Sequence, residues 1–267
     1  MLTGTDITVS VGDRHLLQGI SLSVAPGETV ALIGENGAGK STLLSVLCGD
    51  RLPSAGSVAI NGRPLRSMRP GERARARALL AQEQHDLPGY TALEVVLIGR
   101  YAHIACVPSR ADRDIAQAAL ANVDASHFAT RLMQTLSGGE RARVHLARTL
   151  AQLMGADHDV GRYLLLDEPT ASLDVAHQHL IMDRVRGFAA EHRIGVVAVL
   201  HDFNLAARYV DRLLCLKQGR ALALGGPEAV LTEPLLSDAF GMRCTVMSQL
   251  PGGRPLVVVL GSGLETV

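Results

Sequence analysis

The chain has 267 residues, of which 47% are hydrophobic, and its 26 lysines and arginines balance its 26 aspartates and glutamates. This composition excludes a disordered chain, because it supplies enough apolar surface for a sizeable core. The neutral balance gives no electrostatic reason to expect binding to nucleic acid or to an anionic membrane surface, so any bound anion needs a local site.

Cysteine usage and apolar runs indicate where the chain works. The N-terminus lacks the basic and apolar regions of a signal peptide, and the four cysteines form no C-x-x-C pair. Both features predict that the chain is located in a reducing cytosol. The longest apolar runs, such as VVAVL at 196–200, fall far short of the roughly 20 residues that a membrane-spanning helix needs, so we expect no membrane span.

The N-terminal part of the sequence predicts an antiparallel β lobe. Short strand-like pieces, ITVSV and ISLSV, occur within the first thirty residues. Further along, GSVAINGRPL at 56–65 places Asn61-Gly62 between two such pieces. This dipeptide is a strong hairpin signal, because both residues tolerate a positive φ.

Three short apolar runs predict the strands of a buried parallel sheet. They are TVALIG at 29–34, YLLLDEP at 163–169 and IGVVAVLHD at 194–202. Runs of this kind suit strands that are covered on both faces, with polar residues exposed at the carboxyl ends.

The strand signal fades between about Leu87 and Thr135, where ALEVVLIGRYAH and DRDIAQAALANV show helical periodicity. After about Arg212, strand-like pieces return around a short helical segment. We therefore predict an α/β fold in a single domain over 1–267, with a helical subdomain inserted at about 83–135.

A phosphate-binding loop is predicted by GENGAGKST at 34–42, which matches G-x-x-x-x-G-K-[ST] between a predicted strand and a predicted helix. Its glycines let backbone N–H groups approach phosphates, Lys40 reaches the β and γ oxygens, and Ser41 holds Mg²⁺. The helix start favours an anion as well. The predicted nucleotide-binding residues of this loop are Gly34, Asn36, Gly37, Gly39, Lys40, Ser41 and Thr42.

Acidic residues at the end of the predicted strand YLLLDEP complete a hydrolytic site. Asp167 is placed to order Mg²⁺ and Glu168 to activate an attacking water, which predicts hydrolysis of the terminal phosphate of a nucleotide. His201 ends the next predicted strand and should face the same rim. Gln82 is a weaker candidate for the catalytic site and for Mg²⁺, because Gln84 is equally available.

The stretch LSGGE at 136–140 predicts a second anion-binding helix start. Ser137 and Glu140 form an S-x-x-E capping box, so the N–H groups that follow Ser137 at Gly138 and Gly139 are exposed. One phosphate loop already serves the nucleotide site of this chain. We therefore expect this helix start to contact the nucleotide of another copy.

In that order, GENGAGKST, LSGGE, YLLLDEP, the SLD at 172–174 and His201 resemble the nucleotide-binding subunit of an ABC transporter. The resemblance runs from about Asp6 to Leu260. It implies a P-loop NTPase core that hydrolyses ATP with Mg²⁺, and a homodimer in which LSGGE closes on the ATP of the partner. Ser137 and Gly139 then act in trans, Asp174 lies near the dimer seam, and Gln82 links the site to the permease.

The resemblance also implies the partners. Two separate transmembrane permease subunits would bind the homodimer at the cytoplasmic face of a bacterial inner membrane, and a periplasmic substrate-binding protein would act through them. The helical segment from about Gln82 to Leu132 would receive a permease helix. Nucleic acid is not an expected partner, and a soluble ABC protein that acts on ribosomes or DNA is a distant alternative.

Within the family, LDVAHQHLIMDRVRGFA, VLHDFNLAARYVDRLLCLKQGR and the spacer MGADHDVGR most resemble the subunits of haemin importers. Haem as the cargo is what this similarity implies. Importers of iron-siderophore complexes or cobalamin share the same motor, so both stay as alternatives.

Two residues depart from the family pattern. Val11 stands where an aromatic residue usually stacks on adenine, so we expect the base to be held more loosely or by another side chain, with weak discrimination between ATP and GTP. Glu35 stands where proline is common and is harmless if it faces outward.

Overall fold

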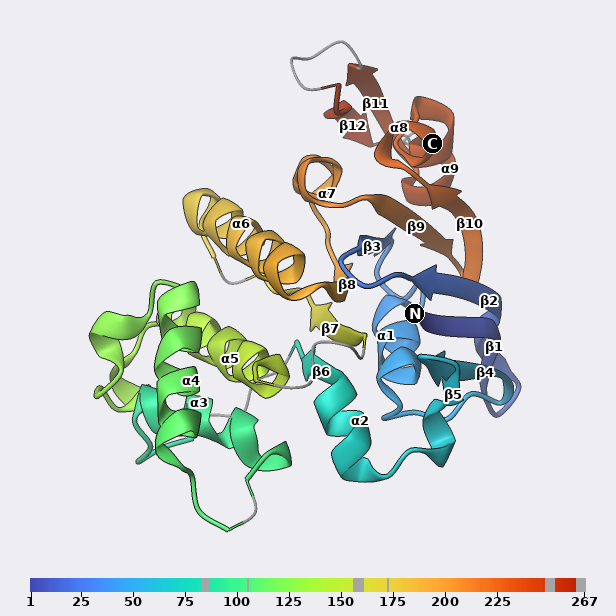
Figure 1. The fold of residues 1–267 in the computed structure, drawn as a ribbon. Helices are drawn as coiled ribbons and strands as arrows, with labels where there is room; N and C mark the ends of the chain where they lie inside the picture. The colour runs from blue at the N-terminus through green and yellow to red at the C-terminus, as the bar shows by residue number, and fades with distance from the viewer. Residues whose placement is uncertain (83–86, 105, 156–160, 172, 248–252, 263–267) are drawn as a thin grey trace.

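The computed structural model describes residues 1–82, 87–104, 106–155, 161–171, 173–247 and 253–262. Two sheets and a group of helices form successive layers (Figure 1). Within the described part of the chain, no helix is both long enough and apolar enough to cross a membrane.

The N-terminal sheet is antiparallel, as the sequence predicted, with the order β2-β1-β4-β5. Its strands are β1 Leu2–Val11, β2 Arg14–Val24, β4 Ala55–Ile60 and β5 Arg63–Pro64. Asn61 and Gly62 have φ values of 52° and 76° between β4 and β5, which confirms the predicted tight hairpin.

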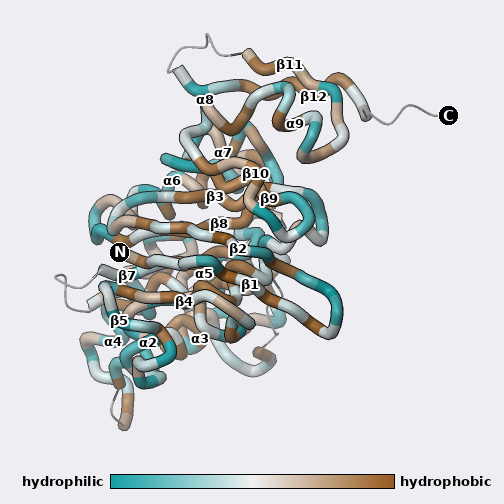
Figure 2. The backbone as a smooth tube through the Cα atoms, turned by 90° about the vertical axis from the view of Figure 1, so that its right-hand side faces the viewer, coloured by the Kyte–Doolittle hydropathy of each residue, from teal (hydrophilic) through white to brown (hydrophobic). Residues whose placement is uncertain are grey.

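A six-stranded sheet with the order β10-β9-β3-β8-β7-β6 forms the centre of the molecule. All its neighbouring pairs are parallel except β10 with β9. The strands are β3 Thr29–Gly34, β6 Arg77–Leu80, β7 Arg162–Asp167, β8 Ile194–Val199, β9 Arg212–Lys217 and β10 Arg220–Gly225. Figure 2 shows the hydrophobic segments along β3, β8 and β9.

Alternating residues of the central strands enter two different cores. Leu164 and Leu166 of β7 pack in the cluster on the helical side. Leu165 packs in the other cluster, which lies under the antiparallel sheet and α1 Lys40–Cys48. Because side chains alternate across a strand, this sheet is covered on both faces and its strands are apolar throughout.

Helices α3, α4 and α5 pack together beside the sheet (Figure 1). They span Ala92–Ile98, Arg110–Asn122 and Gly138–Leu153. Each begins with a capping box, formed by Thr91 with Glu94, Ser109 with Asp112, and Ser137 with Glu140. The start of the predicted inserted subdomain falls in 83–86, outside the described residues, so its bounds of 83–135 stay a prediction.

The remaining helices lie beside the central sheet or near the C-terminus (Figure 1). They are α2 Pro70–Ala76, α6 Val175–His192, α7 Phe203–Tyr209, α8 Pro227–Val230 and α9 Glu233–Phe240. Four short 3₁₀ turns are described at Leu65–Ser67, Gly99–Ala102, Ser126–Phe128 and Met133–Thr135. A small separate sheet pairs β11 Met242–Met247 with β12 Leu256–Ser262.

The buried Arg100 side chain connects α4 with the end of α5. The Arg100 side chain is 4% exposed, and its Nε donates to Asp112 Oδ1 at 3.1 Å. Its Nη1 donates to the carbonyl oxygens of Ala151 and Met154 at the end of α5. One guanidinium therefore pairs with a carboxylate of α4 and also donates to two carbonyl oxygens in the last turn of α5.

Replacing Arg100 with Met should lower the free energy of unfolding by about 3–5 kcal/mol, because the buried Asp112 and the α5 carbonyls lose their donor. The control is Arg63→Met, which breaks an exposed pair with Glu72 and should cost at most about 1 kcal/mol. Urea unfolding followed by circular dichroism measures both. Equal losses in the two variants would contradict the role given to Arg100.

Candidate nucleotide site

The phosphate-loop motif forms the turn between β3 and α1, as the sequence predicted. The Lys40 side chain folds back over this turn, and its Nζ donates to the carbonyl oxygens of Gly34 at 2.7 Å and Glu35 at 2.9 Å. Lys40 is 6% exposed. Burial lowers the pKa of Lys40. The negative charges of the nearby Glu168 and Asp167 offset only part of this effect.

Glycine is required where this loop meets β2. Gly39 precedes α1 with a φ of +104°, which a residue with a side chain rarely adopts. A Cβ on Gly39 would lie 2.7 Å from Leu17 Cδ2 and 2.9 Å from the carbonyl oxygen of Leu16. The loop can therefore lie directly against the start of β2 only because this position carries no side chain.

The parallel pairing brings polar residues from distant segments to the loop. The hydroxyl of Ser41 donates to Asp167 Oδ1 at 3.1 Å. Burial is the main reason that the pKa of Asp167 is raised, and the Ser41 hydrogen bond partly offsets it. The two residues predicted to bind Mg²⁺ at the loop and at the end of β7 are therefore in direct contact.

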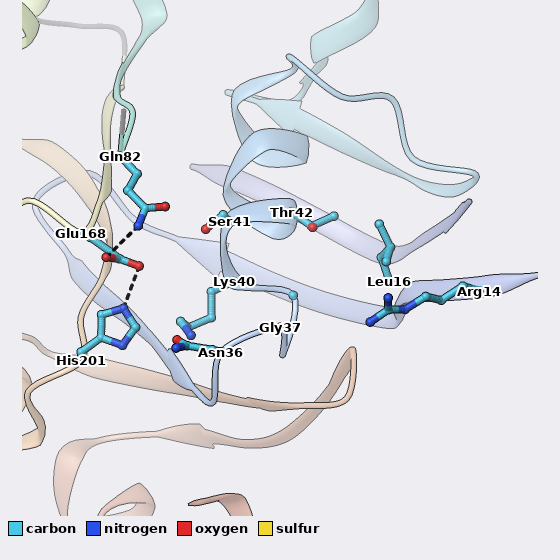
Figure 3. A pocket seen from close by; sticks show the side chains of 11 residues that line it. Arg14, Leu16, Asn36, Gly37, Lys40, Ser41, Thr42, Gln82, Glu168 and His201 are labelled. Carbon is cyan, nitrogen blue, oxygen red and sulfur yellow. Dashed lines mark hydrogen bonds and ion pairs between the residues drawn. The ribbon is translucent and has the colours of Figure 1, made fainter. Parts of the chain in front are cut away.

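Glu168 is held between two side chains that the sequence placed on separate elements. Gln82 Nε2 donates to Glu168 Oε2 at 3.0 Å, and His201 Nε2 lies 2.7 Å from Glu168 Oε1 (Figure 3). Glu168 itself has a φ of +52°, which is rare for a residue other than glycine. Such strain is concentrated at functional sites, because the surrounding structure must hold it in place.

These residues line one cavity of about 680 Å³. Figure 3 shows Glu168 and His201 at one end of it and Lys40 in the middle. The lining residues are Arg14, Leu16, Asn36, Gly37, Gly39, Lys40, Ser41, Thr42, Gln82, Glu168 and His201. Gly34 lies beneath the loop and is buried.

The donors in this cavity fit a nucleotide triphosphate. The Lys40 ammonium has three N–H donors, and the described residues provide hydrogen-bond acceptors for two of them. Among the described residues, no carboxylate forms an ion pair with it. A phosphate oxygen would supply both the missing acceptor and a compensating charge.

The arrangement also fits Mg²⁺ bound together with phosphate. No cluster of three or more His, Cys, Asp or Glu that could hold a metal ion is found among the described residues. A metal here therefore depends on the oxygens of Ser41, Asp167 and Gln82 and on those of the phosphates, which are the ligands that Mg²⁺ prefers. In Figure 3 the Gln82 amide oxygen lies on the side of Ser41.

The second helix start lies outside the lining of this cavity. Ser137 caps α5, where its hydroxyl accepts from the N–H of Glu140 at 3.3 Å, and its own N–H donates to Glu140 Oε2 at 2.7 Å. This confirms the predicted capping box. Gly138 lines a neighbouring hollow of about 460 Å³ that Gln82 and Glu168 also line.

Asp174 caps α6, accepting from the N–H of His177 at 2.9 Å, and its side chain is exposed. Gly139 and Asp174, like Ser137, do not line the nucleotide cavity of their own chain. Ser172 of the SLD motif and Gln84 are outside the described residues.

Comparison with known proteins decides the family. The model of the ABC transporter family matches residues 17–171. This chain belongs to the ABC transporter family. The matched domain is the ATP-binding domain of such transporters, which hydrolyses ATP.

The similarity to individual members of the family extends over nearly the whole chain. The hemin import ATP-binding protein HmuV of Gloeobacter violaceus is 48% identical over 263 residues, which cover 98% of this chain and 95% of the relative. A solved structure described as an ABC transporter of the metal-chelate type, in an inward-facing conformation, superposes with a TM-score of 0.81. It is 25% identical and covers 97% of this chain and 96% of its own.

A bacterial ABC transporter cassette that was solved as a dimer superposes with a TM-score of 0.75. It is 27% identical and covers 85% of this chain and 99% of its own. The α/β fold predicted for the ABC ATPase family is therefore confirmed.

Sequence reasoning missed Arg14 and Leu16, which line the cavity at the start of β2. The available signal was the period of two along this strand, which puts residues 14 and 16 on one face. Val11, the position at which the family pattern places an aromatic residue, is 59% exposed and does not line the cavity. Glu35 is also exposed and lies outside that lining.

Proposed function

We propose that this chain is the ATP-hydrolysing motor subunit of a bacterial importer whose cargo is haem. The observation that carries the motor assignment is the position of Glu168, which is fixed by Gln82 and His201 at one end of a cavity whose centre holds Lys40. A carboxylate at the end of a triphosphate site can accept a proton from the water that attacks the last phosphate.

The side chains around the cavity divide this work. Lys40 and the loop bind the β and γ phosphates, while Glu168 is the general base. The amide of Gln82 and the ring of His201 orient the carboxylate of Glu168, and His201 also contacts the γ-phosphate. Ser41, Asp167 and Gln82 would hold Mg²⁺, which neutralises the charge that develops on the phosphates.

A second copy of the chain would complete the site. The capped start of α5 leaves N–H groups at Gly138 and Gly139 without partners within the helix, and such groups attract anions. Ser137, Gly139 and Asp174 lie outside the cavity of their own chain, so we propose that they close on the nucleotide of the partner in a head-to-tail homodimer. A bacterial ABC transporter cassette that was solved as a dimer supports the pairing of two such chains.

The descriptions of the relatives support haem as the proposed cargo. The relative from Gloeobacter violaceus is named for hemin import, and the solved structure that covers 97% of the chain is described as a metal-chelate type ABC transporter. We propose that two permease subunits bind the homodimer at the cytoplasmic face of the inner membrane, through the segment from about Gln82 to Leu132. A periplasmic binding protein delivers the cargo.

Replacing Glu168 with Gln should keep ATP binding and trap a closed dimer, because the amide cannot accept the proton. The rate of hydrolysis should fall by about a hundredfold to ten-thousandfold. Glu35→Gln is the matched control, since it removes an exposed acid of the loop itself whose side chain lies outside the cavity lining. ATPase rates and nucleotide affinities of both variants test this, and hydrolysis by Glu168→Gln at the parent rate would remove Glu168 from the role of base.

Mixing chains altered at Lys40 with chains altered at Ser137 should restore nucleotide occlusion. Neither homodimer has an intact composite site, whereas each heterodimer combines the intact loop of one chain with the intact helix start of the other. Retention of labelled ATP on the mixed dimers measures this. A mixture of two differently tagged chains that both lack Lys40 is the control, and failure of the first mixture to exceed it would count against action in trans.

Transport by the complete complex should respond to haem. The chain would be purified with its permease and reconstituted in liposomes, with ATP on the side of the motor. Binding protein loaded with haem, a ferric siderophore or cobalamin is added on the opposite side. Stimulated hydrolysis and uptake with haem alone support the assignment, whereas a response to another cargo alone would overturn haem and leave the motor in place. Vesicles with Glu168→Gln control for uptake without hydrolysis.

A further inference from the structure

The proposed phosphate chemistry uses residues at and near the Glu168 end of the nucleotide cavity and leaves Arg14 and Leu16, at the other end, without a role. Figure 3 shows Arg14 and Leu16 at this end, with Lys40 between them and Glu168. When the phosphates lie over Lys40 with the last one toward Glu168, the ribose and base extend toward Arg14. In that orientation the nucleobase would lie at this end of the cavity.

The fold fixes the start of β2 at this position. Arg14 and Leu16 are two residues apart on one strand, so their side chains lie on the same face. The backbone of β2 touches the phosphate loop, because the carbonyl oxygen of Leu16 lies 2.9 Å from the point where Gly39 would carry a Cβ. The backbone from which the Arg14 side chain extends is therefore placed close to the loop that would hold the phosphates.

Val11 and Arg14 are directly paired across the hairpin that joins β1 and β2. Directly opposed side chains lie on the same face of an antiparallel pair. Val11 is 59% exposed and does not line the cavity, whereas Arg14, with its longer side chain, does. Of this directly opposed pair, Arg14 is therefore the residue that can contact a base at this end of the cavity.

Arg14 is available for this contact. Within the part of the chain that the structure describes, no carboxylate forms an ion pair with its guanidinium, and its side chain is exposed. The guanidinium group is planar, weakly hydrated and stacks on aromatic faces. The half-buried Leu16 supplies an apolar wall next to it.

We propose that Arg14 is the nucleobase platform of this ATPase, with the plane of its guanidinium stacked on the base of the bound nucleotide. The proposal rests on the proposed nucleotide site and adds the residue that holds the base. Stacking uses the face of a base and does not read its edge, so it tolerates adenine and guanine alike. The chain should therefore discriminate weakly between ATP and GTP.

Calorimetric titration of the purified chain with ATP, GTP and inorganic tripolyphosphate separates base from phosphate contacts. Arg14→Ala should weaken ATP and GTP by about tenfold or more and leave tripolyphosphate affinity unchanged. Arg14→Lys keeps the charge without the plane and should resemble Arg14→Ala. Arg14→Phe restores a planar face and should recover the affinity for both nucleotides.

Two control variants separate stacking from general effects. Arg220→Ala removes another exposed arginine next to β2, one that hydrogen-bonds Gln18 at 2.8 Å, and it should change none of the three affinities. Val11→Ala should also change none. Far-UV circular dichroism of every variant reports whether the fold is retained.

Several outcomes would overturn the proposal. They are an equal loss of tripolyphosphate and ATP binding in Arg14→Ala, full ATP affinity in Arg14→Lys, and a strong preference of the parent for ATP over GTP. Lys40→Ala tests the site itself, because it should abolish tripolyphosphate binding. If Lys40→Ala does so while Arg14→Ala changes nothing, the nucleotide site stands and only the role of Arg14 fails.

Discussion

The parallel pairing of β3, β8, β7 and β6 is the constraint on which the site depends. Its register places the last residues of these strands at one edge, with Leu80 beside Leu166, Asp167 beside Val199 and Val199 beside Leu32. Each strand then delivers its next polar residues to the same rim. The phosphate loop, the two acids, His201 and Gln82 meet there although they are far apart in the sequence. A shift of one residue in any pair would separate them.

Within that rim, Glu168 contacts side chains that come from two different parts of the fold. His201 follows β8 at the centre of the sheet, whereas Gln82 follows β6 at the sheet edge, just before the segment that leads to α3. The carboxylate of Glu168 accepts a hydrogen bond from Gln82 and is in contact with the ring of His201. A displacement of the segment that carries Gln82 must therefore change the hydrogen bonds of Glu168. A displacement of the helices that follow Gln82 would in this way alter the position of Glu168, the group proposed to activate water.

Much of the site could be predicted because its chemistry depends on local sequence. The strand before the loop, the loop, the helix after it and the capping box at Ser137 are each fixed by residues that are neighbours in the chain. Strand β6 was not predicted, since RALL is short, directly follows an arginine-rich helix and becomes a strand by pairing with β7. Arg14 was missed for a similar reason, because its place in the cavity depends on contact between β2 and a loop some twenty residues later.

The cargo depends on interactions of another kind. The side chains that line the cavity can contact a nucleotide. The chemistry of nucleotide hydrolysis is the same whatever molecule crosses the membrane. Selection of the cargo requires contact with it, and the proposed partners make that contact. The motifs for ATP are therefore constrained by the central sheet, whereas any signal for haem lies in surfaces that recognise those partners. Similarity over the whole chain can carry that signal, but no single motif of the nucleotide site can.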